Sequence, residues 1–339
     1  MNGFTTADDI INNGAGMCRV SQKDVRRVVT LRSSGSTGPA KRLYFTEGDL
    51  ERTADYFRRG MAHISPPGSS VAIMLGSASP DGLGSLLAEG LERLGARPFL
   101  HGAVGDFGEA AAFLAELRPD VIVAAPAPLR RLALTLPLLR PSAVLLSSDY
   151  IAESLRRTVT RVWDTVVYSH YGLTESGLGF AVQCSALEGH HIREDEFYTE
   201  IIDPDTGAVL PDGQWGEIVF TTLRREAMPL ERYRTGDISR ILPGVCSCGS
   251  CSKRLGRILG RLEEIKKPVS IYTLDELLFE CDEIFDYSAS LCGNELRLKV
   301  AGDADRAEEI LRRALPGFTV SAEAAADIKT EGKRRVALL

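Results

Sequence analysis

The segment SSVAIMLG (residues 69–76) is a short apolar run, and DGLGSLLAEGLERLG (residues 81–95) follows it with leucines at helical spacing. A short continuous apolar run bounded by turn residues is typical of a strand buried on both faces. A strand and then a helix, repeated, indicates parallel strands joined by helical crossovers. This pair of segments therefore favours an α/β fold.

The same alternation extends on both sides of that pair. The helical segments are TEGDLERTADYFRRGMAHI (46–64), GEAAAFLAELRP (108–119), PLRRLALTLPLL (128–139) and AESLRRTVTRVW (152–163). The strand-like segments are RPFLHG (97–102), DVIVAAP (120–126), SAVLLSS (142–148) and TVVYSHYG (165–172). We expect a large N-terminal domain of mainly parallel sheet with helices on both faces. Thr46 and Asp49 have the spacing of a capping box at the start of the first of these helices.

The pattern changes after Gly189. EFYTEIID (196–203), GEIVFTTL (216–223) and RYRTGDISRIL (232–242) are strand-like and are joined by turns, which predicts an antiparallel β region. The last part of the chain predicts helices at 273–285 and 305–315 and two strands around Cys292-Gly293-Asn294, a small α+β domain. We expect two domains, residues 1–261 and 262–339.

The composition excludes some classes of protein. The 339 residues carry a formal net charge of −6, which argues against nucleic acid as the main partner. No apolar run is long enough to span a membrane, and the N-terminal residues lack the apolar region of a signal peptide, so we expect a cytoplasmic protein. Seven cysteines then indicate thiols or metal ligands. Nothing in the sequence indicates an oligomeric state.

The loop SSGSTGPAK (residues 33–41), taken alone, is either a flexible linker or a phosphate-binding loop. It does not match the P-loop, in which the lysine directly follows the second glycine. Three more short segments follow in order: YGLTE (171–175), YRTGD (233–237) and RILGRLEE (257–264). Together the four segments resemble the motifs of the adenylate-forming superfamily, which includes acyl-CoA synthetases, adenylation domains and luciferases.

Within that superfamily, residues 188–238 and the cysteine-rich segment after them resemble the phenylacetate–CoA ligase branch. The resemblance runs from about Phe4 to Arg261. It implies that a carboxylic acid attacks the α-phosphate of ATP to give an acyl-adenylate and pyrophosphate, and that the acyl group then passes to CoA. Members of the branch usually carry a longer segment before the point that matches Phe4, so we expect one helical layer of the large domain to be reduced.

The resemblance also assigns roles in the first loop. Its hydroxyls and glycines would hold the β- and γ-phosphates through side-chain O–H and backbone N–H groups. These residues are Ser33, Ser34, Gly35, Ser36, Thr37 and Gly38. Lys41 matches the cation of this loop, although Pro-Ala-Lys replaces the usual order in which lysine directly follows proline.

Further roles fall on YGLTE. Tyr171, with Gly172, would stack on adenine, Thr174 would contact the α-phosphate and Glu175 would hold Mg²⁺. Charge that builds on the phosphates needs such cations close by.

The remaining assignments come from later segments. Asp237 would accept hydrogen bonds from the ribose hydroxyls, for which an ionised carboxylate is suited, and Arg261 would reach the ribose or the phosphates. Asp149 takes the acyl-pocket position, where the branch usually has a glutamate. Glu263 lies at the hinge of the family, about which the small domain rotates. Lys333, in TEGKRRV (330–336), is nominated as the late catalytic lysine, although a solvated lysine in a frayed tail is the alternative.

A metal site is predicted by CSCGSC (residues 246–251), because neighbouring thiolates repel one another unless a cation stabilises them. Cys246 and Cys248 supply two ligands, and the resemblance implies Cys184 and His191 as the others, in a structural zinc site. Two neighbours could replace a ligand in this set: His190 and Cys251. Free surface thiols and a nucleic-acid-binding zinc ribbon are alternatives, and the ribbon lacks a full pair of CxxC motifs.

Three functions follow from these residues. The first is an ATP-dependent acyl–CoA ligase of the phenylacetate type that uses ATP, Mg²⁺ and CoA. The second is an adenylylating enzyme that does not transfer to CoA, because EEIKKPVSIYT (263–273) lacks the glycine that helps form the pantetheine passage in CoA ligases. The third is a non-catalytic nucleotide-binding relative, which the retention of Glu175 and Asp237 disfavours.

Overall fold

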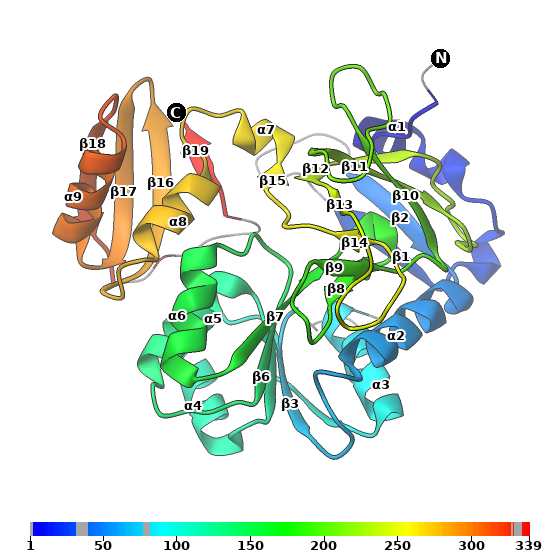
Figure 1. Ribbon diagram of the computed structural model, residues 1–339, viewed down its shortest axis with the longest axis horizontal. Coiled ribbons are helices and arrows are strands. Elements are labelled where there is room, and N and C mark those ends of the chain that lie inside the picture. The colour runs from blue at the N-terminus through cyan, green and yellow to red at the C-terminus, as the bar shows by residue number, and fades with distance from the viewer. Residues whose placement is uncertain (1–2, 32–39, 77–81, 327, 329–333) are drawn as a thin grey trace.

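The computed structural model describes residues 3–31, 40–76, 82–326, 328 and 334–339. The predicted phosphate-loop residues 33–38 and Lys333 lie outside the described residues. Within them, the largest sheet has nine strands, which lie at the centre of the molecule (Figure 1). In spatial order these are β13 (Ile241–Leu242), β14 (Arg254–Leu255), β9 (His190–Ile192), β8 (Ala181–Gln183), β7 (Val166–Tyr171), β6 (Ala143–Leu146), β5 (Val121–Ala124), β3 (Ser70–Met74) and β4 (Arg97–Leu100).

Helices cover both faces of the parallel strands, as the sequence predicts. They are α2 (Glu47–Met61), α3 (Leu83–Leu94), α4 (Phe107–Leu117), α5 (Pro126–Thr135) and α6 (Glu153–Trp163). Strand β3 shows why two layers form: Val71 and Ile73 pack in one core with α2 and α3, whereas Ala72 and Met74 pack in the other with α4, α5 and α6. No helix within the described residues is long and apolar enough to cross a membrane.

Strand β7 marks a change of direction in the large sheet. It pairs parallel with β6 on one side and antiparallel with β8 on the other. The chain leaves β7 at Tyr171 and enters a short 3-10 helix, η2 (Thr174–Ser176). The YGLTE segment therefore lies where the parallel part of the sheet meets the antiparallel part.

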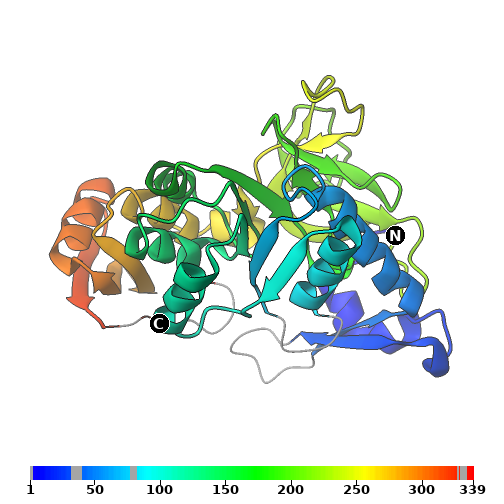
Figure 2. The ribbon, with the colours of Figure 1, turned by 90° about the horizontal axis from the view of Figure 1, so that it is seen from below.

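The predicted antiparallel region is a separate four-stranded sheet. Its strands, in spatial order, are β10 (Phe197–Ile202), β11 (Gly216–Thr222), β12 (Tyr233–Ser239) and β15 (Gly260–Arg261). The N-terminal residues add α1 (Ala7–Met17), the 3-10 helix η1 (Gln22–Asp24) and the hairpin of β1 (Arg27–Leu31) and β2 (Lys41–Phe45). Figure 2 shows this hairpin and α1 at the opposite end of the molecule from the C-terminal residues.

The C-terminal residues form a small mixed unit. Its sheet has the order β18 (Thr319–Ala324), β17 (Glu295–Gly302), β16 (Ile284–Cys292) and β19 (Val336–Leu338), and its helices are α8 (Ile271–Leu278) and α9 (Ala304–Ala314). The short helix α7 (Leu262–Ile265) instead contacts β12 and β15 of the antiparallel sheet. The predicted strand pair around Gly293 is confirmed as the hairpin of β16 and β17.

A buried arginine joins this unit to the helical layer of the large sheet. Arg130 of α5 has no exposed surface, and its guanidinium donates to the carbonyl oxygens of Ile284, at 2.7 Å, and Cys281, at 2.7 Å. It also donates to the carbonyl of Phe279, at 3.1 Å, and lies over that ring. One core cluster contains side chains of α5, α6 and α8 together. The division after Arg261 stays a prediction.

Candidate active site and metal site

Three segments distant in sequence meet at Glu175. Lys41, at the start of β2, forms an ion pair with the Glu175 carboxylate, and the Tyr233 hydroxyl at the start of β12 donates to the same oxygen at 2.8 Å. Glu175 itself is only 5 % exposed. The structure thus brings together two of the predicted catalytic residues, 134 positions apart.

The charge of this group follows from its neighbours. Burial raises the pKa of Glu175, but the positive charge of Lys41 and the hydrogen bonds from Lys41 and Tyr233 outweigh it, and the pKa lies below its ordinary value. Burial, together with the Glu175 carboxylate, raises the pKa of Tyr233, which keeps its hydroxyl protonated and able to donate. Glu175 is therefore an ionised carboxylate, the ligand type that Mg²⁺ prefers.

The second carboxylate of the site is that of Asp237, which lies on β12. Tyr171, at the end of β7, donates its hydroxyl to Asp237 Oδ2 at 2.8 Å. Arg261 is the neighbour of Asp237 in the pairing of β12 with β15, and its Nε lies 3.6 Å from Oδ1. Tyr171 is 9 % exposed and its ring contacts Phe180 edge-on. The predicted ribose ligand is thus held between an aromatic side chain and a guanidinium.

The turn that carries Thr174 has no space for a side chain at Gly172. A Cβ at Gly172 would lie 2.3 Å from the carbonyl oxygen of Leu178, so a side chain there would force the turn open. Thr174 is half-buried in η2. After it, Gly177 adopts φ +76°, and its carbonyl accepts a hydrogen bond from Thr53 of α2 at 2.9 Å.

Asp149 lies in the loop after β6, beside the end of β7 in the parallel pairing. Its carboxylate accepts the N–H of Tyr150 at 2.8 Å, and the preceding residue, Ser148, has the left-handed value φ +78°. Burial raises the pKa of Tyr272 and of Asp275, both on α8, and the negative charge of Asp149 adds to both shifts.

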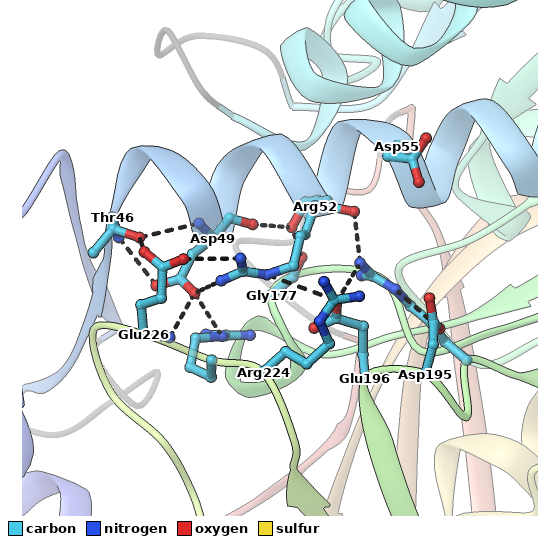
Figure 3. Close-up of polar contacts among 12 residues, drawn as sticks. Thr46, Asp49, Arg52, Asp55, Gly177, Asp195, Glu196, Arg224 and Glu226 are labelled. Atoms are coloured by element: carbon cyan, nitrogen blue, oxygen red, sulfur yellow. Dashed lines mark hydrogen bonds and ion pairs between the residues drawn. The ribbon is translucent and has the colours of Figure 1, made fainter.

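A network of charged side chains behind the turn was not predicted from the sequence (Figure 3). Its centre is Asp49 of α2, whose side chain is fully buried and pairs with Arg52 at 2.7 Å and Arg225 at 3.7 Å. Asp49 also accepts the N–H groups of Glu226, at 2.9 Å, and Ala227, at 3.0 Å. The network thereby joins α2 to the segment between β11 and β12. The predicted capping box is confirmed, since Asp49 also accepts the N–H of Thr46.

We expect Asp49→Asn to lower the free energy of unfolding by about 3 kcal/mol, because it leaves the buried Arg225 without its counter-charge. Burial raises the pKa of Asp49, but Arg225 and the N–H donors outweigh this and hold it below its ordinary value of 3.8. The stabilisation is therefore present above about pH 4 and is lost as the pH falls through the folded pKa. Urea unfolding at pH 7 and at low pH measures both effects.

Asp55→Asn is the matched control for that variant. Asp55 lies on the same helix and pairs with Arg58 and Arg59, but its side chain is 37 % exposed, so its loss should cost less than about 1 kcal/mol. Equal destabilisation by the two variants would contradict the special role of Asp49.

The predicted metal ligands converge at the far end of the large sheet. One ligand atom each from Cys184, His191, Cys246 and Cys248 lies within 4.8 Å of all the others. The Cys184 and Cys246 sulfurs are 3.6 Å apart, and Cys248 Sγ is 3.4 Å from His191 Nε2. Three thiols and an imidazole at this spacing fit a tetrahedral Zn²⁺ ion, and four protein ligands would leave no open position.

The two alternative ligands do not belong to this group. Successive residues of a strand point to opposite faces, so in β9 His191 faces the cysteines while His190 is buried against the Ser169 hydroxyl, at 2.6 Å. Cys251 is exposed and is not among the four residues whose ligand atoms converge.

The chain is similar in sequence to known enzymes. The phenylacetate–coenzyme A ligase of Pseudomonas putida is 34 % identical over 274 residues, which cover 77 % of this chain and 61 % of that protein. The enzyme of the same description from Thermus thermophilus is 34 % identical over 271 residues, 76 % of this chain and 60 % of that protein. The chain thus spans about 60 % of the length of these relatives. No protein-family model matches the chain.

A solved structure shows the same fold. The crystal structure of 2-hydroxyisobutyryl-CoA ligase in the postadenylation state, with 2-HIB-AMP, has a TM-score of 0.82 at 19 % identity and covers 99 % of this chain and 79 % of that chain. The same ligase in the thioesterification state gives a TM-score of 0.69. The chain belongs to the adenylate-forming superfamily. Within it, the chain is a distant homologue of the phenylacetate–coenzyme A ligases.

Proposed function

We propose that the protein activates a carboxylic acid with ATP, releases pyrophosphate and transfers the acyl group to CoA. The observation that supports this most is the pair of buried carboxylates on β12 and η2. Glu175 is held by Lys41 and Tyr233, and Asp237 by Tyr171 and Arg261. One acidic group that suits Mg²⁺ thus lies beside another that suits a ribose diol.

The roles of the residues follow from these contacts. Glu175 would hold Mg²⁺ on the phosphates, and Lys41 would balance the charge that develops on them. Thr174 would contact the α-phosphate from the same turn. Asp237 and Arg261 would bind the ribose, which requires the Tyr171 ring to keep its hydroxyl on Asp237 while one face contacts adenine.

The remaining residues of the proposed site take the roles that the family resemblance gives them. The hydroxyls and glycines of residues 33–38 would cover the phosphates, Gly172 would let the turn approach adenine, and Asp149 would line the acid pocket. Lys333 would stabilise the charge on the reacting carboxylate. A hinge at Glu263 would let the C-terminal unit move between the half-reactions.

The metal would be structural. Zn²⁺ held by Cys184, His191, Cys246 and Cys248 would fasten the 246–251 segment to β9 and the residues after β8. Reduced thiolates of this kind, and a need for ATP, fit a protein that works in the cytoplasm. The net charge of −6 supports small molecules, not nucleic acid, as its partners.

One observation supports transfer to an acceptor other than CoA. The connection between the nucleotide-binding strand β15 and α8 consists of α7 and a short link, residues 266–270, and it carries no glycine. This is the segment that lacks the glycine of the pantetheine passage. The alternative is therefore an enzyme that forms the AMP ester and passes the acyl group elsewhere.

Carboxylate-dependent ATP–pyrophosphate exchange, with and without CoA, tests both proposals. We expect exchange with at least one acid of a panel of aryl, arylacetic and short-chain acids, and a thioester product when CoA is present. Exchange without a thioester product would select the alternative. No exchange with any acid, from protein that is folded and holds zinc, would overturn both.

A further inference from the structure

We propose that Glu276 is a positioning residue for the acid pocket of the proposed site, although it lies on α8 of the C-terminal unit. Its carboxylate holds the turn of residues 147–151, which carries Asp149, in place. This inference rests on the proposed function, because it takes that turn as part of the site.

Helix α6, which follows the turn, has no cap of its own. Its N-cap residue is Ala152, whose methyl group cannot accept a hydrogen bond, and no side-chain cap from the helix itself is present. The first N–H groups of a helix need an acceptor. Glu276 supplies it: Oε1 accepts the N–H of Glu153 at 3.0 Å, and Oε2 accepts the N–H of Ser154 at 3.1 Å.

The same carboxylate binds the side chain at the end of the turn. The Tyr150 hydroxyl donates to Glu276 Oε1 at 3.1 Å, and Arg257 forms an ion pair with Glu276 and donates to the Tyr150 oxygen at 2.7 Å. Burial raises the pKa of Glu276, but the two N–H donors and Arg257 outweigh it and hold the pKa below its ordinary value. Glu276 is thus an ionised acceptor for donors from three segments.

The turn needs such support. Ser148 is in the left-handed region at φ +78°, where a residue with a side chain is strained. Asp149 is held by the N–H of Tyr150, so the place of its carboxylate depends on where Tyr150 lies. Because Glu276 fixes Tyr150 and the start of α6 at once, it fixes the Asp149 side chain through them.

Other contacts hold α8 in the position from which Glu276 reaches the turn. The Ser154 hydroxyl donates to the carbonyl of Asp275 at 3.0 Å, and Arg130 binds the carbonyls that follow α8. The geometry of the pocket turn is therefore set by the docking of the C-terminal unit. When that unit moves away, the turn and the first turn of α6 lose their common acceptor.

Amide hydrogen exchange and the acid dependence of ATP–pyrophosphate exchange, measured on the full chain, test this. Glu276→Ala should speed hydrogen exchange of the amides of Glu153 and Ser154 by about 10-fold, the size of effect expected when a helix loses its cap, and should raise the acid concentration for half-maximal ATP–pyrophosphate exchange by a similar factor. Glu276→Gln keeps an acceptor oxygen and should recover part of both effects. Glu280→Ala is the control, since Glu280 pairs with Arg157 at the same interface but does not touch the turn.

The capping contact, the positioning role and the proposed function can each be contradicted by a different result. Unchanged amide exchange in Glu276→Ala would overturn the capping contact. Faster amide exchange with a wild-type half-maximal acid concentration, or an equal rise of that concentration in Glu280→Ala, would reduce Glu276 to a structural residue and overturn the positioning role. Folded wild-type protein that shows no acid-dependent ATP–pyrophosphate exchange would overturn the proposed function, and the positioning role with it.

Discussion

Replacing Glu175 by Gln should lower the rate of acyl-adenylate formation by about 100-fold or more, the loss expected when one electrostatic contact to developing charge is removed. The amide cannot neutralise Lys41 or act as an anionic ligand of Mg²⁺. Because the amide still accepts the hydrogen bond of Tyr233, the fold around η2 should be retained. The rate is measured by ATP–pyrophosphate exchange at saturating acid over a range of Mg²⁺ concentrations.

A control variant and a second measurement test the catalytic role of Glu175. Glu231→Gln removes an exposed carboxylate two residues before Tyr233 and should leave exchange unchanged. The Mg²⁺ concentration for half-maximal exchange should rise in Glu175→Gln. If both variants exchange at the wild-type rate, Glu175 has no catalytic role, and its pair with Lys41 is a structural contact only.

Cys246→Ser should remove the metal. We expect one zinc per chain in the wild-type protein and much less in the variant, because a serine hydroxyl is not deprotonated as a thiol is. Zinc binding stabilises the folded state, so the variant and a chelator-treated wild type should both unfold at a lower urea concentration. The expected loss in the free energy of unfolding is several kcal/mol. Elemental analysis and urea unfolding measure the two quantities.

Cys251→Ser is the matched control. Cys251 lies in the same segment, but its sulfur is not among the four ligand atoms that converge. This variant should keep its zinc and its stability. If both variants lost zinc equally, Cys251 would be a ligand in place of one of the four proposed residues. Wild-type protein without zinc would contradict the proposed metal site.

Much of the fold is local in origin and could be predicted. The parallel strands are short apolar runs between helices, and β3 and β5 appear in the sequence as VAIM and VIVA. The capping box at Thr46 depends on residues three apart. The grouping of Cys184 and His191 with Cys246 and Cys248 came from the family resemblance, and the structure brings one ligand atom of each within 4.8 Å of the others. The alternation of faces along β9 explains why His191, and not His190, faces the cysteines.

Contacts between distant segments could not be predicted in this way. Lys41 meets Glu175 across 134 positions, and Glu276 reaches Ser154 across 122, with no periodicity to indicate either contact. Tyr233 could have been found, because it lies four residues before Asp237 in β12, an even spacing, and both side chains are buried. In the sequence, Arg130 interrupts the apolar run of residues 121–139, which gives no sign that its side chain is fully buried.

The buried Arg130 also has a consequence for biosynthesis. Its acceptor at Phe279 lies 149 positions further along the chain, so α5 and α6 leave the ribosome long before the surface that covers them. During that interval their apolar face is open to other chains, which is the condition under which nascent proteins aggregate or engage chaperones. The last quarter of the chain thus completes the parallel domain as well as its own sheet, and translation that stops before α8 leaves the earlier domain unfinished.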